Sequence, residues 1–172
     1  MQAVKTRFSS HLPGVLGLTS FVVLILILGT IVSVASAAGT YDVSDYGARG
    51  DGSSDDTAAV QRAIDAAAAT SGTVSFHGGT YRVSSALRLR SGVTLAGVPG
   101  ESVLYMSAKG ALTPLLYGHN LQNTVVQDLT LRSDGPTSQV LGVSMDGISG
   151  GVLRRLRFEG LWSAPPELDQ LD

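Results

Sequence analysis

Two pairs of polar residues share one spacing that could bring them together on a folded surface. Asp128 precedes Arg155 by 27 positions, and Thr130 precedes Arg157 by the same 27 positions. If 27 residues make one turn of a repeating fold, the members of each pair lie on neighbouring strands about 4.8 Å apart. Two interpretations stay open. Asp128 and Arg155 form a surface ion pair of small energetic weight, or the arginines bind carboxylate groups of a ligand.

A repeated apolar pattern supports this spacing. Segment 123–131, NTVVQDLTL, aligns with segment 150–158, GGVLRRLRF. The coinciding apolar residues are Val125 with Val152, Leu129 with Leu156, and Leu131 with Phe158. Side chains two positions apart on a strand share a face, so we expect each set of three to point to one side. A strand that recurs at a solenoid repeat length predicts coils stacked in parallel.

Short alternating segments separated by Gly-, Ser- or Pro-containing turns predict an all-β fold. The expected strands are 41–46, 73–76, 80–83, 86–89, 93–96, 102–106, 115–117, 125–131, 140–145 and 152–158. Residues 47–54 are rich in Gly, Asp and Ser and are expected to form a loop.

An Ala-rich segment at about 55–70 predicts the main helix. Its apolar stripe consists of Val60, Ala63, Ile64 and Ala67. We expect Asp55 and Asp56, just before Thr57, to cap the free N–H groups of the first turn. Gly72 is expected to take a left-handed conformation after the last turn. An amphipathic helix placed before the first coil predicts a cap over the open end of a solenoid.

Four strings of residues occur in a fixed order: YGARGDG at 46–52, DDTAAVQ at 55–61, GTVSF at 72–76 and GTY at 79–81. Together they resemble the opening of the pectate-lyase superfamily, in particular its rhamnogalacturonase/epimerase-like members. The motif residues are Gly47, Gly50, Asp51, Gly52, Asp55, Asp56 and Thr57. The resemblance is close over 41–81 and looser to about residue 160. It implies a right-handed parallel β-helix with an N-terminal capping helix, and an extracellular acidic polysaccharide as substrate or ligand.

The resemblance does not carry one activity, because the superfamily includes hydrolases, lyases, epimerases and binding proteins. Hydrolysis of the inverting kind needs two separated carboxylates, yet Asn-Thr-Asp, Gly-His-Gly and a late Asp-Asp pair are missing from the sequence. A lyase-like calcium site needs six to eight oxygens, and Asp128 and Asp146 are too few for one. We therefore expect no cofactor, with calcium only if the chemistry is lyase-like, and an incomplete catalytic centre with its catalytic residues unknown.

Three functional hypotheses follow from the resemblance. In the first, the protein is related to carbohydrate-active enzymes and binds or modifies an acidic glycan, with Asp128, Arg155 and Arg157 as candidate contacts. In the second, it is a non-catalytic glycan-binding or structural surface module, similar to a tailspike. In the third, it is an inactive gene remnant. The sequence assigns no oligomeric state.

Isolated histidines and aromatic residues receive structural interpretations. His77 and His119 lie on turn-like segments, and we expect solvated side chains without partners. The aromatic residues that could stack on sugars are Tyr81, Tyr105, Tyr117 and Phe158, and we expect each of them to pack in the core or at its rim.

Composition and the first 37 residues indicate the compartment. The formal charge of −2 shows no basic bias towards nucleic acid, and the lack of Cys excludes a disulfide framework. Lys5 and Arg7 precede an apolar run at 21–28, and small residues follow at 35–37. This pattern predicts a signal peptide over 1–37, with an uncleaved membrane anchor as the alternative. We expect a secreted or outward-facing protein, in contact with the membrane only through that leader.

The remaining chain divides in two by composition. Residues 38–160 are expected to form the β-helix domain with its capping helix. Residues 161–172 no longer alternate, and Pro165 and Pro166 argue against a central strand. We expect an irregular C-terminal tail there.

Overall fold

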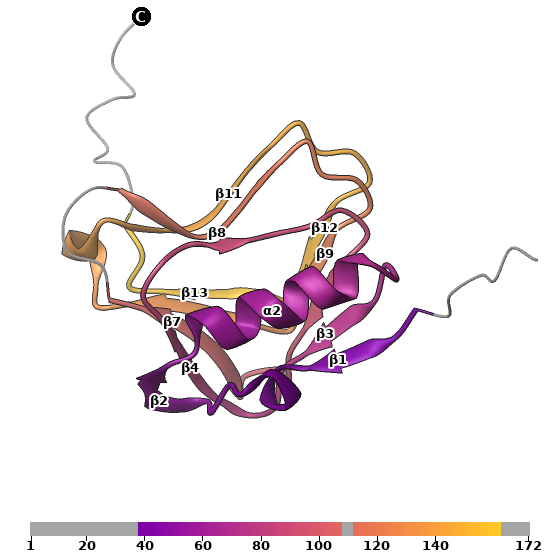
Figure 1. The fold of residues 1–172 in the computed structure, drawn as a ribbon. Helices are drawn as coiled ribbons and strands as arrows, with labels where there is room; N and C mark the ends of the chain where they lie inside the picture. Colours follow the sequence, from indigo (N-terminus) through magenta and orange to yellow (C-terminus); the bar gives the residue numbers. More distant parts are fainter. Residues whose placement is uncertain (1–37, 108–111, 163–172) are drawn as a thin grey trace, which may run out of the picture. The chain divides into compact units, whose positions relative to one another are not determined.

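The computed structural model describes residues 38–107 and 112–162. Their strands form three sheets (Figure 1). Sheet A has the order β1 (Thr40–Asp42), β3 (Thr73–Ser75), β6 (Thr94–Ala96), β9 (Val125–Gln127) and β12 (Val152–Arg154). Sheet B has the order β2 (Asp51–Asp55), β4 (Gly79–Val83), β7 (Ser102–Met106), β10 (Thr130–Ser133) and β13 (Arg157–Glu159). Sheet C has the order β5 (Leu87–Arg88), β8 (Thr113–His119) and β11 (Val140–Asp146).

The strand pairing confirms the predicted parallel β-helix. The pairs within each sheet are parallel, and the chain visits the sheets in turn as it climbs from coil to coil. Val125 pairs with Val152, and Leu131 pairs with Phe158. The 27-residue spacing found in the sequence is therefore one coil in this part of the solenoid.

The predicted strands at 125–131 and 152–158 are each broken by a corner. Asp128 has a φ of 59° and Arg155 a φ of 51°, so each turns the chain from sheet A into sheet B. The corner changes which side chains face inward: Val126 is fully buried, whereas Val125 is half-buried. The expectation that Val125 shares a face with Leu129 and Leu131 is wrong, because the strand period does not continue through a left-handed residue.

Two further expectations about the first coil are corrected. The segment 41–46 contains strand β1 only to Asp42, and Val43–Tyr46 form a 3-10 helix whose first turn is capped when Asp42 accepts a hydrogen bond from Ser44 N at 2.8 Å. The expected loop at 47–54 contains most of β2, which pairs with β4. The parallel neighbour, rather than the propensity of Asp, Gly and Ser, makes this segment a strand.

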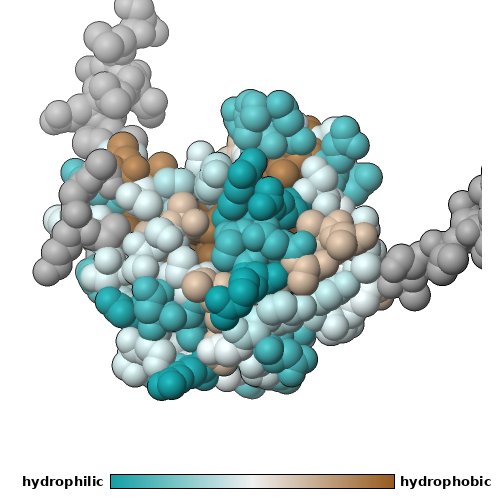
Figure 2. Space-filling view, viewed as in Figure 1, coloured by the Kyte–Doolittle hydropathy of each residue, from teal (hydrophilic) through white to brown (hydrophobic). Residues whose placement is uncertain are grey.

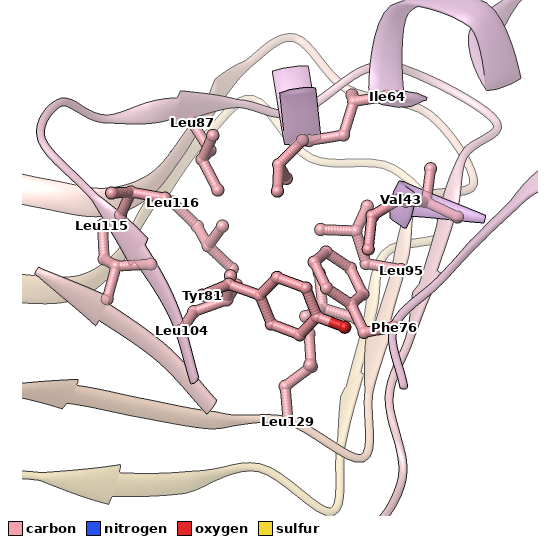
Figure 3. Packing of buried hydrophobic residues seen from close by; sticks show 14 of the residues in the cluster. Val43, Ile64, Phe76, Tyr81, Leu87, Leu95, Leu104, Leu115, Leu116 and Leu129 are labelled. Atoms are coloured by element: carbon pink, nitrogen blue, oxygen red, sulfur yellow. The ribbon is translucent and has the colours of Figure 1, made fainter. Parts of the chain in front are cut away.

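The core fills the space enclosed by the three sheets and is closed by helix α2 (Thr57–Ala68). Figure 3 shows Ile64 of the helix and Val43 near it, above side chains from successive coils such as Leu104 and Leu129. The buried helix residues are Ala59, Val60, Ala63, Ile64 and Ala67. Hydrophilic residues lie over the outer side of the helix (Figure 2). The predicted capping helix is confirmed.

Both ends of α2 differ in detail from the prediction. Asp55 accepts a hydrogen bond from Thr57 N at 3.0 Å, as expected of a residue at a helix start. Asp56 does not cap the helix: its two oxygens accept hydrogen bonds from Arg49 N at 2.8 Å and Gly50 N at 3.0 Å. Asp56 therefore holds the Gly-rich loop instead of capping the helix.

The left-handed residue after the helix is Ser71, with a φ of 50°, rather than Gly72. Gly72 is required for space, since a Cβ there would lie 2.5 Å from the carbonyl oxygen of Gly39. The close approach of Gly39, just before β1, to the chain after α2 therefore explains why residue 72 is a glycine.

The expected leader over 1–37 and the tail from residue 163 onward lie outside the described residues. Leu161 and Trp162 have no regular structure, and Trp162 N donates a hydrogen bond to Val140 O at 2.9 Å. Within 38–107 and 112–162, no helix combines the length and the hydropathy needed to cross a bilayer.

Candidate functional site

The outer surface of sheet C gathers polar and aromatic side chains from successive coils. Arg88 of β5 pairs in register with Tyr117 of β8, and Tyr117 pairs with Ser144 of β11. Two positions further along, His119 pairs with Asp146. These side chains are exposed because they alternate with inward-facing residues of the same strands, such as the fully buried Leu87. We call Arg88, Tyr117, His119, Ser144 and Asp146 the sheet C face.

Arg88 differs from the other arginines of the described residues. Its backbone N and O bond the side chain of Gln61, but its guanidinium makes no hydrogen bond, ion pair or ring contact within 38–107 and 112–162. The other described arginines contact backbone or side-chain oxygens, or a ring: Arg49, Arg62, Arg82, Arg90, Arg132, Arg154, Arg155 and Arg157. An unpaired guanidinium fork matches the two oxygens of a carboxylate.

His119 is exposed, as expected, but it has two partners that the sequence did not reveal. Its Nδ1 lies 2.7 Å from Asp146 Oδ1, and its Nε2 lies 2.8 Å from the amide nitrogen of Asn120. With an amide donating to Nε2, the ring proton belongs on Nδ1, where Asp146 accepts it. The Asp146 carboxylate and the Asn120 amide thus fix the orientation of the imidazole between them.

His77 also has a partner that the sequence did not reveal. Its Nε2 contacts the carboxylate of Asp42, which also bonds Ser44. Desolvation opposes ionisation of Asp42, but the bonds from Ser44 and the contact with His77 together lower its pKa. This pair joins the first two strands of sheet A and lies apart from the sheet C face.

Tyr117 is the aromatic residue best placed to meet a ligand on the sheet C face. It is 38% exposed on the outer side of β8. Tyr81 is in the core, as expected, and burial raises its pKa. Tyr105 donates its hydroxyl to Asp134 on the outside of sheet B. Phe158 pairs with the buried Leu131 and so occupies an inward-facing position of sheet B, but it lies in the last described coil and is 54% exposed.

The candidate pair Asp128 and Arg155 forms a direct two-point contact. Arg155 Nε donates to Asp128 Oδ1 at 2.5 Å, and its Nη2 donates to Oδ2 at 2.6 Å. The hydrogen bonds from Arg155 lower the pKa of Asp128. The two side chains occupy the corner between sheets A and B, and each satisfies the other. The geometry supports the ion-pair interpretation, and a glycan-contact role for them stays a prediction.

Arg157 is the third candidate contact and lies on sheet B. It pairs in register with Thr130, as the 27-residue spacing predicts, and its Nε bonds Glu159 Oε1 at 2.5 Å. Arg157 is therefore separated from the sheet C face by the body of the solenoid. Sequence reasoning did not assemble the sheet C face, although the same spacing applied to His119 leads to Asp146.

The motif residues at 47–57 build the first coil. Gly47, Gly50 and Gly52 have φ values of 94°, 62° and 74°, which favour glycine. Asp51 accepts hydrogen bonds from the backbone of residues 53 and 54, and these bonds lower its pKa. Bonds from Ser84 and then from Thr57 lower the pKa of Asp55 from 3.8 to about 2. These contacts are structural, and they tie the loop and the helix start to sheet B.

Within 38–107 and 112–162, no group of three or more His, Asp or Glu side chains converges as metal ligands. The sheet C face offers a cation, an aromatic ring and a His–Asp pair, which can contact the carboxylate, the ring face and the hydroxyl groups of an acidic sugar.

Comparison with known proteins agrees with the fold. Residues 40–151 match the family model of rhamnogalacturonase A/epimerase, pectate lyase-like proteins. The chain is 42% identical over 127 residues to mannuronan C5-epimerase AlgE4 of Azotobacter vinelandii, covering 66% of this chain and 22% of that protein. It is 38% identical over 127 residues to alginate lyase 7 of the same organism, covering 66% of this chain and 14% of that protein. The solved AlgE4 A-module is similar with a TM-score of 0.58 and 34% identity, over 69% of this chain and 38% of that one.

Proposed function

Since the chain belongs to the rhamnogalacturonase A/epimerase, pectate lyase-like family, we propose that it binds an acidic polysaccharide on the sheet C face. Relatives named for acting on mannuronan and alginate support a uronate-containing glycan as the ligand. The chain spans 22% of the length of AlgE4, so the activity of AlgE4 is not assigned to it, and only binding by residues of this chain is proposed.

The single observation that carries the proposal is the guanidinium of Arg88, which has no partner in the described part of the chain and lies on the strand next to the exposed Tyr117. A uronate carboxylate can take two parallel hydrogen bonds from Arg88. The apolar side of the same sugar can then lie against Tyr117 in the next coil. The His119–Asp146 pair and Ser144 lie beside them and can bond sugar hydroxyls.

The charge of the whole chain does not oppose this binding strongly. The formal charge is −2, and charges more than a Debye length of about 8 Å away are screened at physiological ionic strength. The local cation on the sheet C face therefore matters more than the sum over the chain. Added salt should weaken the binding of an anionic glycan.

Calorimetric titration with mannuronan oligosaccharides tests the proposal. We expect Arg88→Ala to weaken binding about tenfold or more, because a hydrogen-bonded charge pair is lost. Arg154→Ala is the matched control, since it removes the same charge from the outside of sheet A, where Arg154 bonds Gln127. A neutral glucan should not bind. Equal losses in Arg88→Ala and Arg154→Ala, or no binding of the oligosaccharide to the wild type, would reject the site.

The same samples separate a catalytic protein from a binding module. Ultraviolet absorbance of an unsaturated uronate would indicate elimination, and a changed ratio of mannuronate to its C5 epimer in the NMR spectrum would indicate epimerisation. Binding without either change supports the non-catalytic module. We also propose that the protein acts outside the cytoplasm, based on the leader pattern of residues 1–37, and cell fractionation would test this location.

A further inference from the structure

The capping helix contacts the arginines of strand β5 and its continuation. The side chain of Gln61 bonds Arg88 twice, with Oε1 accepting from N at 2.8 Å and Nε2 donating to O at 3.1 Å. Gln61 thus pairs with the edge of sheet C as a neighbouring strand would. One helical turn later, Asp65 Oδ1 accepts from Arg90 Nε at 2.7 Å.

Arg88 and Arg90 lie on the same side of the chain. The fully buried Leu87 and the almost fully buried Leu89 alternate with them, and Leu89 N continues the ladder by bonding Tyr117 O at 2.8 Å. Residues two apart on an extended strand are separated by about 6.6 Å. Arg88 and Arg90 therefore leave the chain on the same side, at the edge of the sheet C face, where the Arg90 side chain contacts Asp65 of α2.

The contact between Asp65 and Arg90 leaves most of the guanidinium unused. Asp65 engages Nε only, and the two Nη groups make no hydrogen bond within the described ranges. A guanidinium has five N–H donors, so one monodentate contact leaves an edge that can bind a second carboxylate. The contact also limits the side-chain motion of Arg90, which reduces the entropy lost on binding.

We propose that the sheet C face takes two carboxylates of one uronan chain, the first on Arg88 and the second on Arg90, with Asp65 as the positioning residue for Arg90. This inference rests on the proposed function and adds a second carboxylate contact, at Arg90, to the contact at Arg88. It also gives α2 a second role, because the helix that closes the core holds the backbone of Arg88 and the side chain of Arg90.

A pair of titrations tests the inference, with free mannuronate and with a short mannuronan oligosaccharide as ligands. The wild type should bind the oligosaccharide more tightly than the monosaccharide by about tenfold or more, since a second charged contact forms. Arg90→Ala should remove most of that preference and leave the weaker monosaccharide binding unchanged. Arg88→Ala should weaken both ligands, and the control Arg154→Ala should weaken neither by more than its effect on net charge.

The role of Asp65 is tested by two variants that lose the same charge. Asp65→Asn keeps an oxygen that can accept from Arg90 Nε, whereas Asp65→Ala does not. We expect Asp65→Ala to bind the oligosaccharide about threefold more weakly than Asp65→Asn, because Arg90 must then be ordered on binding. Thermal unfolding of each variant checks that the fold is kept. Should Arg90→Ala not fold, Arg90→Gln, which removes the charge and keeps much of the side-chain length, replaces it.

The outcomes distinguish this inference from the proposed function. If binding of the oligosaccharide is lost in Arg88→Ala but unchanged in Arg90→Ala, the second carboxylate site is wrong and the first is kept. If Asp65→Asn and Asp65→Ala bind equally, Asp65 has no positioning role. If neither ligand binds the wild type, the proposed function itself fails.

Discussion

The coil under the capping helix and the last described coil have similar inward residues but very different burial. In sheet A, Val74, Leu95 and Val126 are fully buried, whereas Leu153 in the same column is 46% exposed. In sheet B, Leu104 and Leu131 are fully buried, whereas Phe158 beside Leu131 is 54% exposed. Residue type and register are alike within each column. Burial therefore depends on whether a layer lies on both sides.

The two regions also satisfy their polar backbone groups differently. Near the helix, side chains replace the missing coil: Gln61 bonds the backbone of Arg88, and Thr57 Oγ1 accepts from Ser84 N at 2.8 Å. At the last coil, an apolar hollow of about 540 Å³ is found instead. Its lining residues are Gly142, Val143, Leu153, Phe158, Gly160, Leu161 and Trp162. Helix α2 therefore covers the apolar end of the core and bonds the backbone of the neighbouring strands, as a further coil would.

The largest expected effect tests the difference in burial directly. Leu104→Ala should lower the free energy of unfolding by about 3 kcal/mol, because it removes a fully buried side chain and leaves a cavity. Phe158 lies in the same column of sheet B, paired with Leu131 of the preceding coil. Phe158→Ala should cost only about 1 kcal/mol, because about half of the residue is already exposed to water. Urea denaturation measures both. Equal costs would show that another layer covers Phe158 in solution.

An intermediate effect is expected at the loop held by Asp56. The carboxylate is 1% exposed and bonds the N–H groups of Arg49 and Gly50. Asp56→Ala should destabilise the protein by about 2 kcal/mol, since both donors lose their acceptor. Asp56→Asn, which keeps one acceptor oxygen, should cost less. If the alanine variant is as stable as the wild type in urea, Asp56 does not organise the capped end.

The smallest effect concerns the pH dependence of the capped end. Hydrogen bonds from Ser84 and Thr57 lower the pKa of Asp55 to about 2, below its ordinary value of 3.8. The unfolded chain then binds a proton more readily than the folded one, so the stabilisation is present above about pH 4 and is lost as the pH falls towards 2. Asp55→Asn should reduce the slope of unfolding free energy against pH in this window. An unchanged slope would mean that the bonds to Asp55 are not kept in solution.

The capping helix and the positions of many strands could be predicted from the sequence. The apolar stripe of Val60 and Ile64 identified the capping helix, and the order of Gly and Asp motifs indicated the parallel β-helix. Most expected strands are confirmed to within about one residue, for example β4 and β7. These features depend on local periodicity and on a repeat, both of which are visible in a linear chain.

The corners and the sheet C face were not predictable in the same way. Asp128 and Arg155 have left-handed conformations, which the sequence did not predict. Because of the corner at Asp128, Val126 faces inward and Val125 does not. Arg88 pairs with Tyr117, 29 positions later, whereas Tyr117 pairs with Ser144, 27 positions later, so these two coils differ in length. A single spacing therefore connects His119 with Asp146 but not Arg88 with Tyr117.

By itself, the sequence determined that successive short strands would stack into a parallel solenoid and that an Ala-rich helix would close one end. Apolar periodicity decides this, because each coil can bury its inward side only against its neighbours. The tertiary structure alone decided which residue at each corner faces inward, and that Arg88, whose guanidinium has no partner among the described residues, lies next to Tyr117. The reason is physical: lateral neighbours in a solenoid are set by the number of residues in each coil and by the turn conformations, which no single segment contains.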